Sequence, residues 1–183
     1  MKLSAFHVLL VGAVLSGCAG GPMPQTGEEY RAGIAKGGFG SEMNTYEVNR
    51  PYKKVADALV SKSKECLNVK LAKNKCVRQG VANSCKAYEV FYRPTVVKTA
   101  SKTQLHVQWR RDPWDSMFLG GGQPPAEGLF IAAFDVEPAG PGKTKVTTYG
   151  PSIDHLKTVP NAVKHWVEGT NMGCPDLTKP YYY

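Results

Sequence analysis

Alternation of apolar and polar side chains is the feature that most restricts the fold of this chain. In residues 103–110 the apolar Leu105, Val107 and Trp109 alternate with the polar His106, Gln108 and Arg110. A period of two predicts a strand with one face on a core and one face in water. Similar patterns predict four further strands, at residues 46–48, 88–97, 128–137 and 143–150. In the fourth of the five strands the alternation places these residues on one face: Phe130, Ala132, Phe134 and Val136.

Two segments have the three-and-four spacing of amphipathic helices. One begins at Pro51 and runs to Leu67, and the other runs from Val159 to Val167, with Gly169 just past its end. The predicted order is strand, helix, four strands, helix. This order is typical of an α+β domain, in which two amphipathic helices cover one face of an antiparallel sheet of about five strands. We expect this single domain to span residues 46–177.

The first residues have the pattern of an export signal. Lys2 precedes an apolar stretch from Leu3 to Leu15, which is too short to span a bilayer as a helix. The residues that follow, Leu15-Ser16-Gly17-Cys18, resemble the lipobox of bacterial lipoproteins. The resemblance implies that residues 1–17 are removed and that the Cys18 thiol carries the lipid. An ordinary secretory signal with a chance cysteine is the alternative.

The resemblance also implies a location. In lipoproteins of Gram-negative bacteria an aspartate after the lipidated cysteine favours the inner membrane, and Ala19 stands at that position here. We therefore expect a lipid anchor in the outer membrane, on its periplasmic face. Residues 18–45 are rich in glycine and lack apolar periodicity, so they are predicted to be a flexible tether. Residues 178–183, which end in three tyrosines, are expected to form a short tail.

Four cysteines remain after the proposed lipidation site. An even number of cysteines in an oxidising compartment favours two disulfides. Three pairings are open, and we favour Cys76 with Cys85 and Cys66 with Cys174. Free thiols and a metal site are the alternatives, although the spacing lacks the close cysteine pairs of zinc modules. The element order resembles that of helix-grip domains in some lipoproteins of outer-membrane assembly, but no residue motif accompanies it.

Positive charge is concentrated in residues 50–86, which hold ten Lys and Arg against two acidic residues. Such a local field attracts anions. Export argues against nucleic acid, so we expect an acidic envelope protein, an anionic envelope polymer or the membrane as the partner. A solvated helix face followed by a lysine-rich loop is the alternative. The binding candidates in this segment are Lys53, Lys54, Lys62, Lys64, Lys70, Lys73, Lys75 and Arg78.

A second candidate surface is the long connection between the strands at 103–110 and 128–137. It combines apolar and basic side chains with glycines and prolines that exclude a regular element. It is predicted to insert into a partner or to close over a cavity, and the alternative is that it folds back on the core. Its binding candidates are Arg110, Arg111, Trp114, Met117, Phe118 and Leu119.

Catalytic motifs are not found in the sequence. His106, His155 and His165 occur without a nucleophile elbow, a metalloprotease helix or a phosphate-binding glycine loop. We expect neither an enzyme nor a cofactor or metal. The sequence favours a lipid-anchored periplasmic module that binds another envelope component through the basic segment and the apolar loop. The alternative is a carrier that holds a small lipid or hydrophobic ligand between sheet and helix.

Overall fold

A six-stranded antiparallel sheet forms the centre of the molecule. The computed structural model describes residues 23–37, 40–79, 82–113 and 124–178. The strand order across the sheet is β1-β6-β5-β4-β3-β2. The strands are β1 (Ser41–Val48), β2 (Val69–Gln79), β3 (Ala82–Lys98), β4 (Thr103–Asp112), β5 (Leu129–Pro138) and β6 (Thr144–Pro151). The helices are α1 (Gly27–Ala35), α2 (Tyr52–Leu67), the 3-10 helix η2 (Asp154–Leu156) and α3 (Thr158–Glu168).

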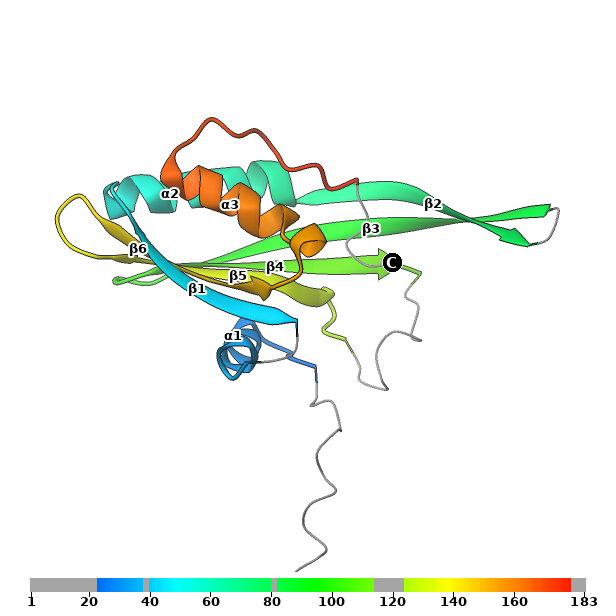
Figure 1. Ribbon diagram of the computed structural model, residues 1–183, viewed down its shortest axis with the longest axis horizontal. Helices are drawn as coiled ribbons and strands as arrows, with labels where there is room; N and C mark the ends of the chain where they lie inside the picture. The colour runs from blue at the N-terminus through cyan, green and yellow to red at the C-terminus, as the bar shows by residue number, and fades with distance from the viewer. Residues whose placement is uncertain (1–22, 38–39, 80–81, 114–123, 179–183) are drawn as a thin grey trace, which may run out of the picture.

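The helices lie on both sides of this sheet. Helices α2 and α3 cover one face, and α1 lies against the opposite face (Figure 1). The predicted α+β class and antiparallel sheet are therefore confirmed, as is the pair of amphipathic helices. The predicted numbers of elements need correction, because the chain has one more strand and one more α-helix within the described residues.

Strand β2 was not predicted, because its sequence looks like a polar connection. The segment VKLAKNKCVRQ alternates lysines with small and apolar residues and offers no continuous apolar face. Pairing with β3 makes it a strand, in register from Val69 opposite Tyr92 to Gln79 opposite Ala82. Because β2 lies at the sheet edge, it needs only this one neighbour.

Helix α1 corrects the prediction of a flexible tether over residues 18–45. The Thr26 hydroxyl accepts a hydrogen bond of 3.1 Å from the backbone N–H of Glu29, which is the usual cap of a helix N-terminus. Strand β1 then begins at Ser41, five residues before the predicted start, and pairs with β6 along its whole length. Glycines at 27, 33 and 37 obscured α1 in the sequence.

The hydrophobic core lies between the sheet and the pair α2 and α3. The fully buried side chains include Leu59 from α2, Val163 from α3 and Phe134 from β5. Each such side chain contributes about 1.5–3 kcal/mol relative to exposure. The helical spacing predicted from the sequence is thus confirmed, since the apolar faces of both helices are the buried ones.

A β-bulge between Val107 and Gln108 corrects one predicted face. Val107 pairs with Ala132, whereas Gln108 pairs with Phe130, so Ile131 is the extra residue of β5. One extra residue reverses the alternation. Phe130 consequently does not share the core face with Ala132, and its ring lies on the side of α1.

The C-terminal end of α3 is held by Arg50, which lies in the chain segment just before α2. Gly169 adopts φ 79° at the C-cap, a left-handed conformation that favours glycine. Arg50 donates hydrogen bonds of 3.0 Å and 2.7 Å to the carbonyl oxygens of Trp166 and Val167. A Cβ atom at Gly169 would lie 2.6 Å from the Arg50 guanidinium. Glycine therefore serves both the turn and the close approach of Arg50.

The part of the chain that the structure describes has two disulfides, and they are the favoured pairing. Cys66 bonds to Cys174 across 108 residues, and Cys76 bonds to Cys85 across nine. The first ties the end of α2 to the segment after α3, and the second joins β2 to β3. Among the described residues, no helix is both long enough and apolar enough to cross a membrane.

The two disulfides should contribute unequally to stability. In the chain-entropy account, removing Cys66–Cys174 costs about 5 kcal/mol, and removing Cys76–Cys85 costs about 3 kcal/mol, because the first closes the longer loop. Urea unfolding of the paired variants Cys66→Ala with Cys174→Ala and Cys76→Ala with Cys85→Ala measures this difference. An equal or larger loss for the second pair would contradict it.

Candidate functional site

A two-stranded basic arm extends beyond the sheet. We define the basic arm as residues 70–79 of β2 and 82–88 of β3. Strand β4 pairs with β3 only from Glu89 to Lys98, so the arm has no third strand beside it from Lys73 onward in β2 and up to Tyr88 in β3. The arm projects past the end of the domain (Figure 1). It is therefore the element of the described chain that reaches furthest from the core.

Positive residues dominate the basic arm. Its sequence contains five Lys and Arg, while residues 66–88 contain no Asp or Glu. The register places Lys75 directly opposite Lys86, next to the paired Cys76 and Cys85. Like charges directly opposite one another destabilise a strand pair, whereas the adjacent disulfide holds the strands together. The basic residues of the arm are Lys70, Lys73, Lys75, Arg78 and Lys86.

The root of the basic arm is fixed to the domain by its own lysines. Lys70 forms an ion pair of 2.7 Å with Glu89, and its ammonium lies 5.3 Å from the centre of the Phe91 ring. Lys73 donates hydrogen bonds of 3.3 Å and 2.7 Å to the carbonyl oxygens of Leu177 and Thr178. Burial lowers the pKa of Lys73. These two lysines are structural as well as basic.

Strand β4 supports the arm from one side. The Arg111 guanidinium lies 4.2 Å from the centre of the Tyr88 ring, which is a cation–π contact. Arg110 instead lies 3.7 Å from Asp112 and donates to the carbonyl oxygen of Ala126. The two arginines predicted to bind a partner thus hold β4, the arm and the following loop together. The four apolar candidates of that loop, Trp114, Met117, Phe118 and Leu119, lie outside the described residues.

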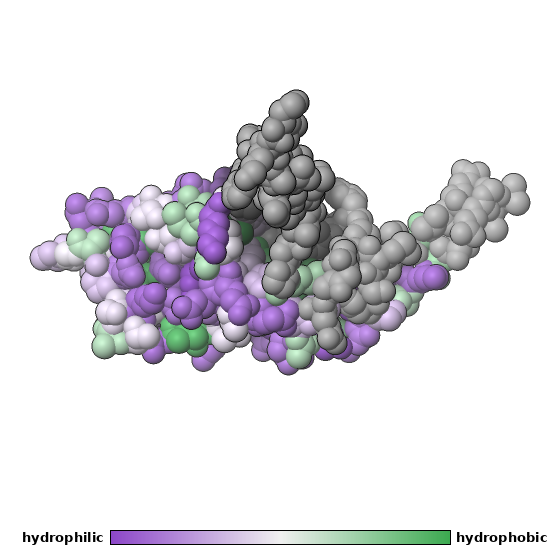
Figure 2. Space-filling model, turned by 90° about the horizontal axis from the view of Figure 1, so that it is seen from below, coloured by the Kyte–Doolittle hydropathy of each residue, from purple (hydrophilic) through white to green (hydrophobic). Residues whose placement is uncertain are grey.

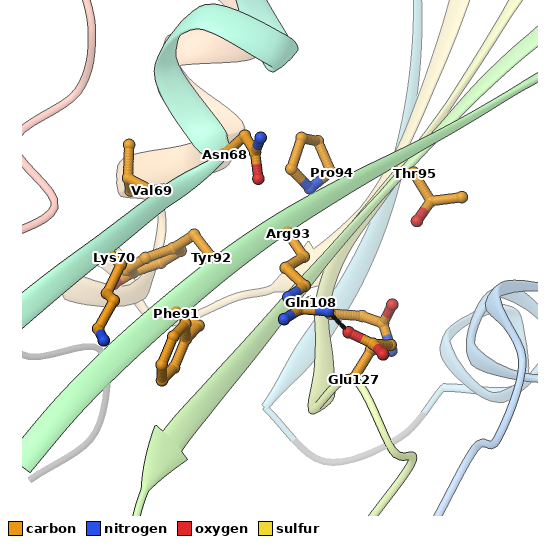
Figure 3. A pocket seen from close by; sticks show the side chains of 10 residues that line it. All are labelled: Asn68, Val69, Lys70, Phe91, Tyr92, Arg93, Pro94, Thr95, Gln108 and Glu127. Carbon is orange, nitrogen blue, oxygen red and sulfur yellow. Dashed lines mark ion pairs between the residues drawn. The ribbon is translucent and has the colours of Figure 1, made fainter.

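An open groove of about 500 Å³ lies beside the arm root. Figure 3 shows Phe91, Arg93, Gln108 and Glu127 along it, with the ion pair between Arg93 and Glu127 across the opening. The groove is lined by Asn68, Val69, Lys70, Phe91, Tyr92, Arg93, Pro94, Thr95, Gln108 and Glu127. A groove lined by Lys70, Arg93, Glu127 and polar side chains is not the apolar cavity between sheet and helix that a lipid carrier would use.

The remaining basic candidates lie on α2, away from the arm. Lys53 forms an ion pair of 2.9 Å with Asp57, and Lys62 forms one of 2.9 Å with Glu65. Lys54 and Lys64 are exposed on the same helix. The basic segment of the sequence therefore divides into two surfaces, a helix with acidic side chains among its lysines and an arm without them.

The opposite face of the sheet holds a buried polar cluster beneath α1. We name this cluster the polar recess and define it by Gln104, His106, Asp135 and Tyr149. Arg31 of α1 contacts the imidazole of His106 and lies 3.7 Å from a carboxylate oxygen of Asp135. Gln104 donates a hydrogen bond of 3.0 Å to Asp135, and Tyr149 donates one of 3.4 Å. The outer surface on this side is mostly hydrophilic over the described residues (Figure 2).

The chemistry of Arg31 fixes the state of His106. Arginine can only donate hydrogen bonds, so the Nε2 atom that it contacts must accept, and the proton lies on Nδ1 of a neutral ring. Burial lowers the pKa of His106 to about 4, with the Arg31 charge acting in the same direction and Asp135 opposing it. The prediction that His106 lies on a solvated face is wrong, since only 8% of it is exposed.

One group of potential metal ligands lies within the described residues. The side chains of Glu65, Cys66 and Cys174 have ligand atoms within 4.8 Å of one another. Both sulfur atoms belong to the same disulfide and offer no thiolate to a metal ion. The disulfide bond therefore explains why the ligand atoms of Glu65, Cys66 and Cys174 lie so close together.

Comparisons with known proteins provide no functional guide. No protein-family model matches the chain, and no curated protein matches it. A conserved protein from Geobacillus kaustophilus is 15% identical, with a TM-score of 0.33, and the alignment covers 69% of this chain and 89% of that one. A hypothetical protein from Helicobacter pylori is 13% identical, with a TM-score of 0.34 and coverage of 83% and 95%. Similarities at these TM-scores carry no argument about function.

Sequence reasoning found the charges of the arm but missed the polar recess. Its residues on β4 alternate with core residues and therefore look like the wet side of a strand. Only a covering helix changes that interpretation, and α1 lies in a segment without apolar periodicity. The signal that could have indicated docking is the aromatic Tyr30 within this glycine-rich segment, and its ring lies 5.9 Å from that of Phe130.

The buried neutral His106 should make stability depend on pH. Its pKa of about 4 lies below the ordinary value of 6.5, so the unfolded chain binds more protons between these values and stability falls as the pH falls through this range. The loss approaches about 3 kcal/mol near pH 4. Urea unfolding of His106→Gln should lack this component, while an exposed-histidine control, His155→Gln, should keep it. Identical pH profiles for wild type and His106→Gln would contradict the assignment.

Proposed function

We propose that this chain is a lipid-anchored periplasmic module that uses its basic arm to bind another, negatively charged component of the bacterial envelope. The lipid is attached at Cys18, in the outer membrane and on its periplasmic face. The observation that carries the proposal is an arm whose part beyond β4 holds four basic residues, Lys73, Lys75, Arg78 and Lys86, and no acidic residue. The proposal includes no catalytic step.

The charge pattern of the arm favours an anionic partner over a purely structural role. A strand pair with Lys75 opposite Lys86 is less stable than one with neutral or opposite charges. An anion bound across the pair would relieve this repulsion. The Cys76–Cys85 bond supports the same interpretation, because it keeps an otherwise unsupported hairpin in a binding-ready shape.

The covalent chemistry is consistent with a periplasmic location. Two disulfides join all four cysteines that follow Cys18, and such bonds persist in oxidising compartments. The leftover cysteine is then the one in the lipobox-like sequence LSGC. We also retain the helix-grip resemblance as a proposal, since α2 and α3 share one face of an antiparallel sheet.

The loop that follows β4, with Trp114, Met117, Phe118 and Leu119, remains a second proposed contact. In the chain it comes directly after Arg110 and Arg111, which contact Ala126 and Tyr88. Carriage of a lipid or hydrophobic ligand remains the alternative function. Native mass spectrometry of protein purified from its own envelope separates the two, since a carrier retains a discrete bound mass and an interaction module does not.

Charge reversal on the arm should weaken binding to an anionic envelope polymer. The probe is purified peptidoglycan, and the readout is cosedimentation of the full mature protein. Taking about 1 kcal/mol per basic side chain near an anionic surface, Lys75→Glu with Lys86→Glu should weaken binding on the order of 30-fold. High salt should weaken the wild type similarly.

The matched control is Lys54→Glu with Lys64→Glu on α2, which changes the net charge by the same amount. This variant should bind within about threefold of the wild type, because screening limits charges at a distance from the contact. Equal losses of binding for the two variants would show that the total charge of the protein determines binding, and would contradict the role of the basic arm. If wild-type protein neither cosediments with peptidoglycan nor recovers a specific partner after crosslinking in intact cells, the proposed function is wrong.

A further inference from the structure

Helix α1 is joined to the sheet chiefly through polar contacts with the recess. Within α1 only Gly27 is buried, and the helix is nine residues long. A helix of this length is unstable alone in water, where about 12–15 residues are needed even for good sequences. Its structure therefore depends on docking against β1, β5 and β6.

The docking contact is unusually specific for such a short helix. The side chains of Arg31 and Asp135 are only 13% and 11% exposed, so the guanidinium lies inside the recess between a carboxylate and the accepting nitrogen of His106. Lys102 also approaches Asp135, at 3.8 Å. The Tyr30 ring meets Phe130, which itself meets the edge of the His106 ring. The recess therefore receives the Arg31 guanidinium, and Phe130 beside His106 receives the Tyr30 ring.

The docking of α1 depends on the absence of a side chain at Gly27, so that a single added methyl group would disturb it. A Cβ atom at this position would lie 2.5 Å from the His106 ring, closer than real Cβ contacts. The ring is held by Arg31 and Phe130 and cannot move away without breaking those contacts. The start of α1 can approach the recess only because residue 27 is glycine.

The position of α1 in the chain gives its docking a mechanical consequence. When α1 is docked, nine residues, 18–26, connect the proposed lipid anchor to the first fixed residue, and they span at most about 30 Å. When α1 is released, 23 residues precede β1, and they span at most about 80 Å. Release therefore more than doubles the distance at which the domain can work from its membrane.

From these contacts we propose that α1 is a releasable latch, which sets a short tether when Arg31 occupies the polar recess and a long tether when it leaves. The latch itself is a property of the folded chain. Its effect on reach rests on the proposed lipidation of Cys18.

Amide hydrogen exchange on the full mature protein tests the latch directly. Gly27→Ala should speed exchange in residues 27–35, while the strands β5 and β6 stay protected. Arg31→Gln should speed the same amides by about 10- to 100-fold, the range for losing a hydrogen bond to a charged group. Helix propensity alone would have the opposite effect, because in an isolated helix alanine would slow exchange by about fivefold relative to glycine. Faster exchange in Gly27→Ala would therefore report the loss of docking.

Gly33→Ala is the matched control in the same helix. A Cβ atom at Gly33 meets nothing within 4 Å, so this variant gains helix propensity without a clash and should exchange no faster than wild type. The latch is overturned if Gly27→Ala exchanges no faster than Gly33→Ala. It is also overturned if the variant loosens β5 and β6 together with α1, because α1 would then be an inseparable part of the fold.

Energy transfer from a dye at Ser61 to acceptor lipids tests the change in reach. Lipidated protein on liposomes should give lower transfer for Gly27→Ala than for wild type and Gly33→Ala. Protein that washes off the liposomes would contradict the proposed anchor while leaving the exchange result intact. Unchanged transfer in retained protein that exchanges as expected would contradict the effect on reach alone.

Discussion

The unequal lengths of neighbouring strands determine what this sheet can present to a partner. Strand β3 has 17 residues and β4 has ten, so only the later part of β3 has a partner on both sides. The earlier part pairs with β2 alone, and a two-stranded ribbon in water is marginal without further support. The Cys76–Cys85 bond, the Arg111–Tyr88 contact and the Lys73 bonds to the C-terminal segment supply that support. They hold an extended basic surface clear of the core.

The sheet faces differ in what stabilises them. One is closed by α2 and α3 through apolar contacts and the Cys66–Cys174 bond, and these contacts hold the domain together. The other is closed by α1 through the buried ion pair of Arg31 with Asp135 and its hydrogen bond to His106, which are more specific but less stabilising. Such a fold keeps its core when α1 undocks from the sheet, as the latch proposal requires. In the sequence α1 lies close to the proposed anchor, Cys18.

The sequence predicted the elements whose period is visible locally. The apolar faces of α2 and α3 and the strands β4, β5 and β6 follow from spacing, and two disulfides follow from the compartment. Three disulfide pairings were open, and the structure has the favoured one. Strand β2 could not be predicted, because pairing with β3 and not its own apolar pattern makes it a strand. Helix α1 and the recess could not be predicted either, since His106 becomes buried only when a glycine-containing segment covers it. The charges of the arm were visible, but their division between α2 and the arm requires the topology.

Site-specific photocrosslinking in intact cells tests most directly whether the basic arm is the element that meets a partner. A photoreactive residue replaces Ala87 on the arm or Ser61 on α2, both exposed positions that leave every charge in place. The account predicts a discrete crosslinked product from position 87 and none from position 61. The same products from both positions, or a product from position 61 alone, would contradict it.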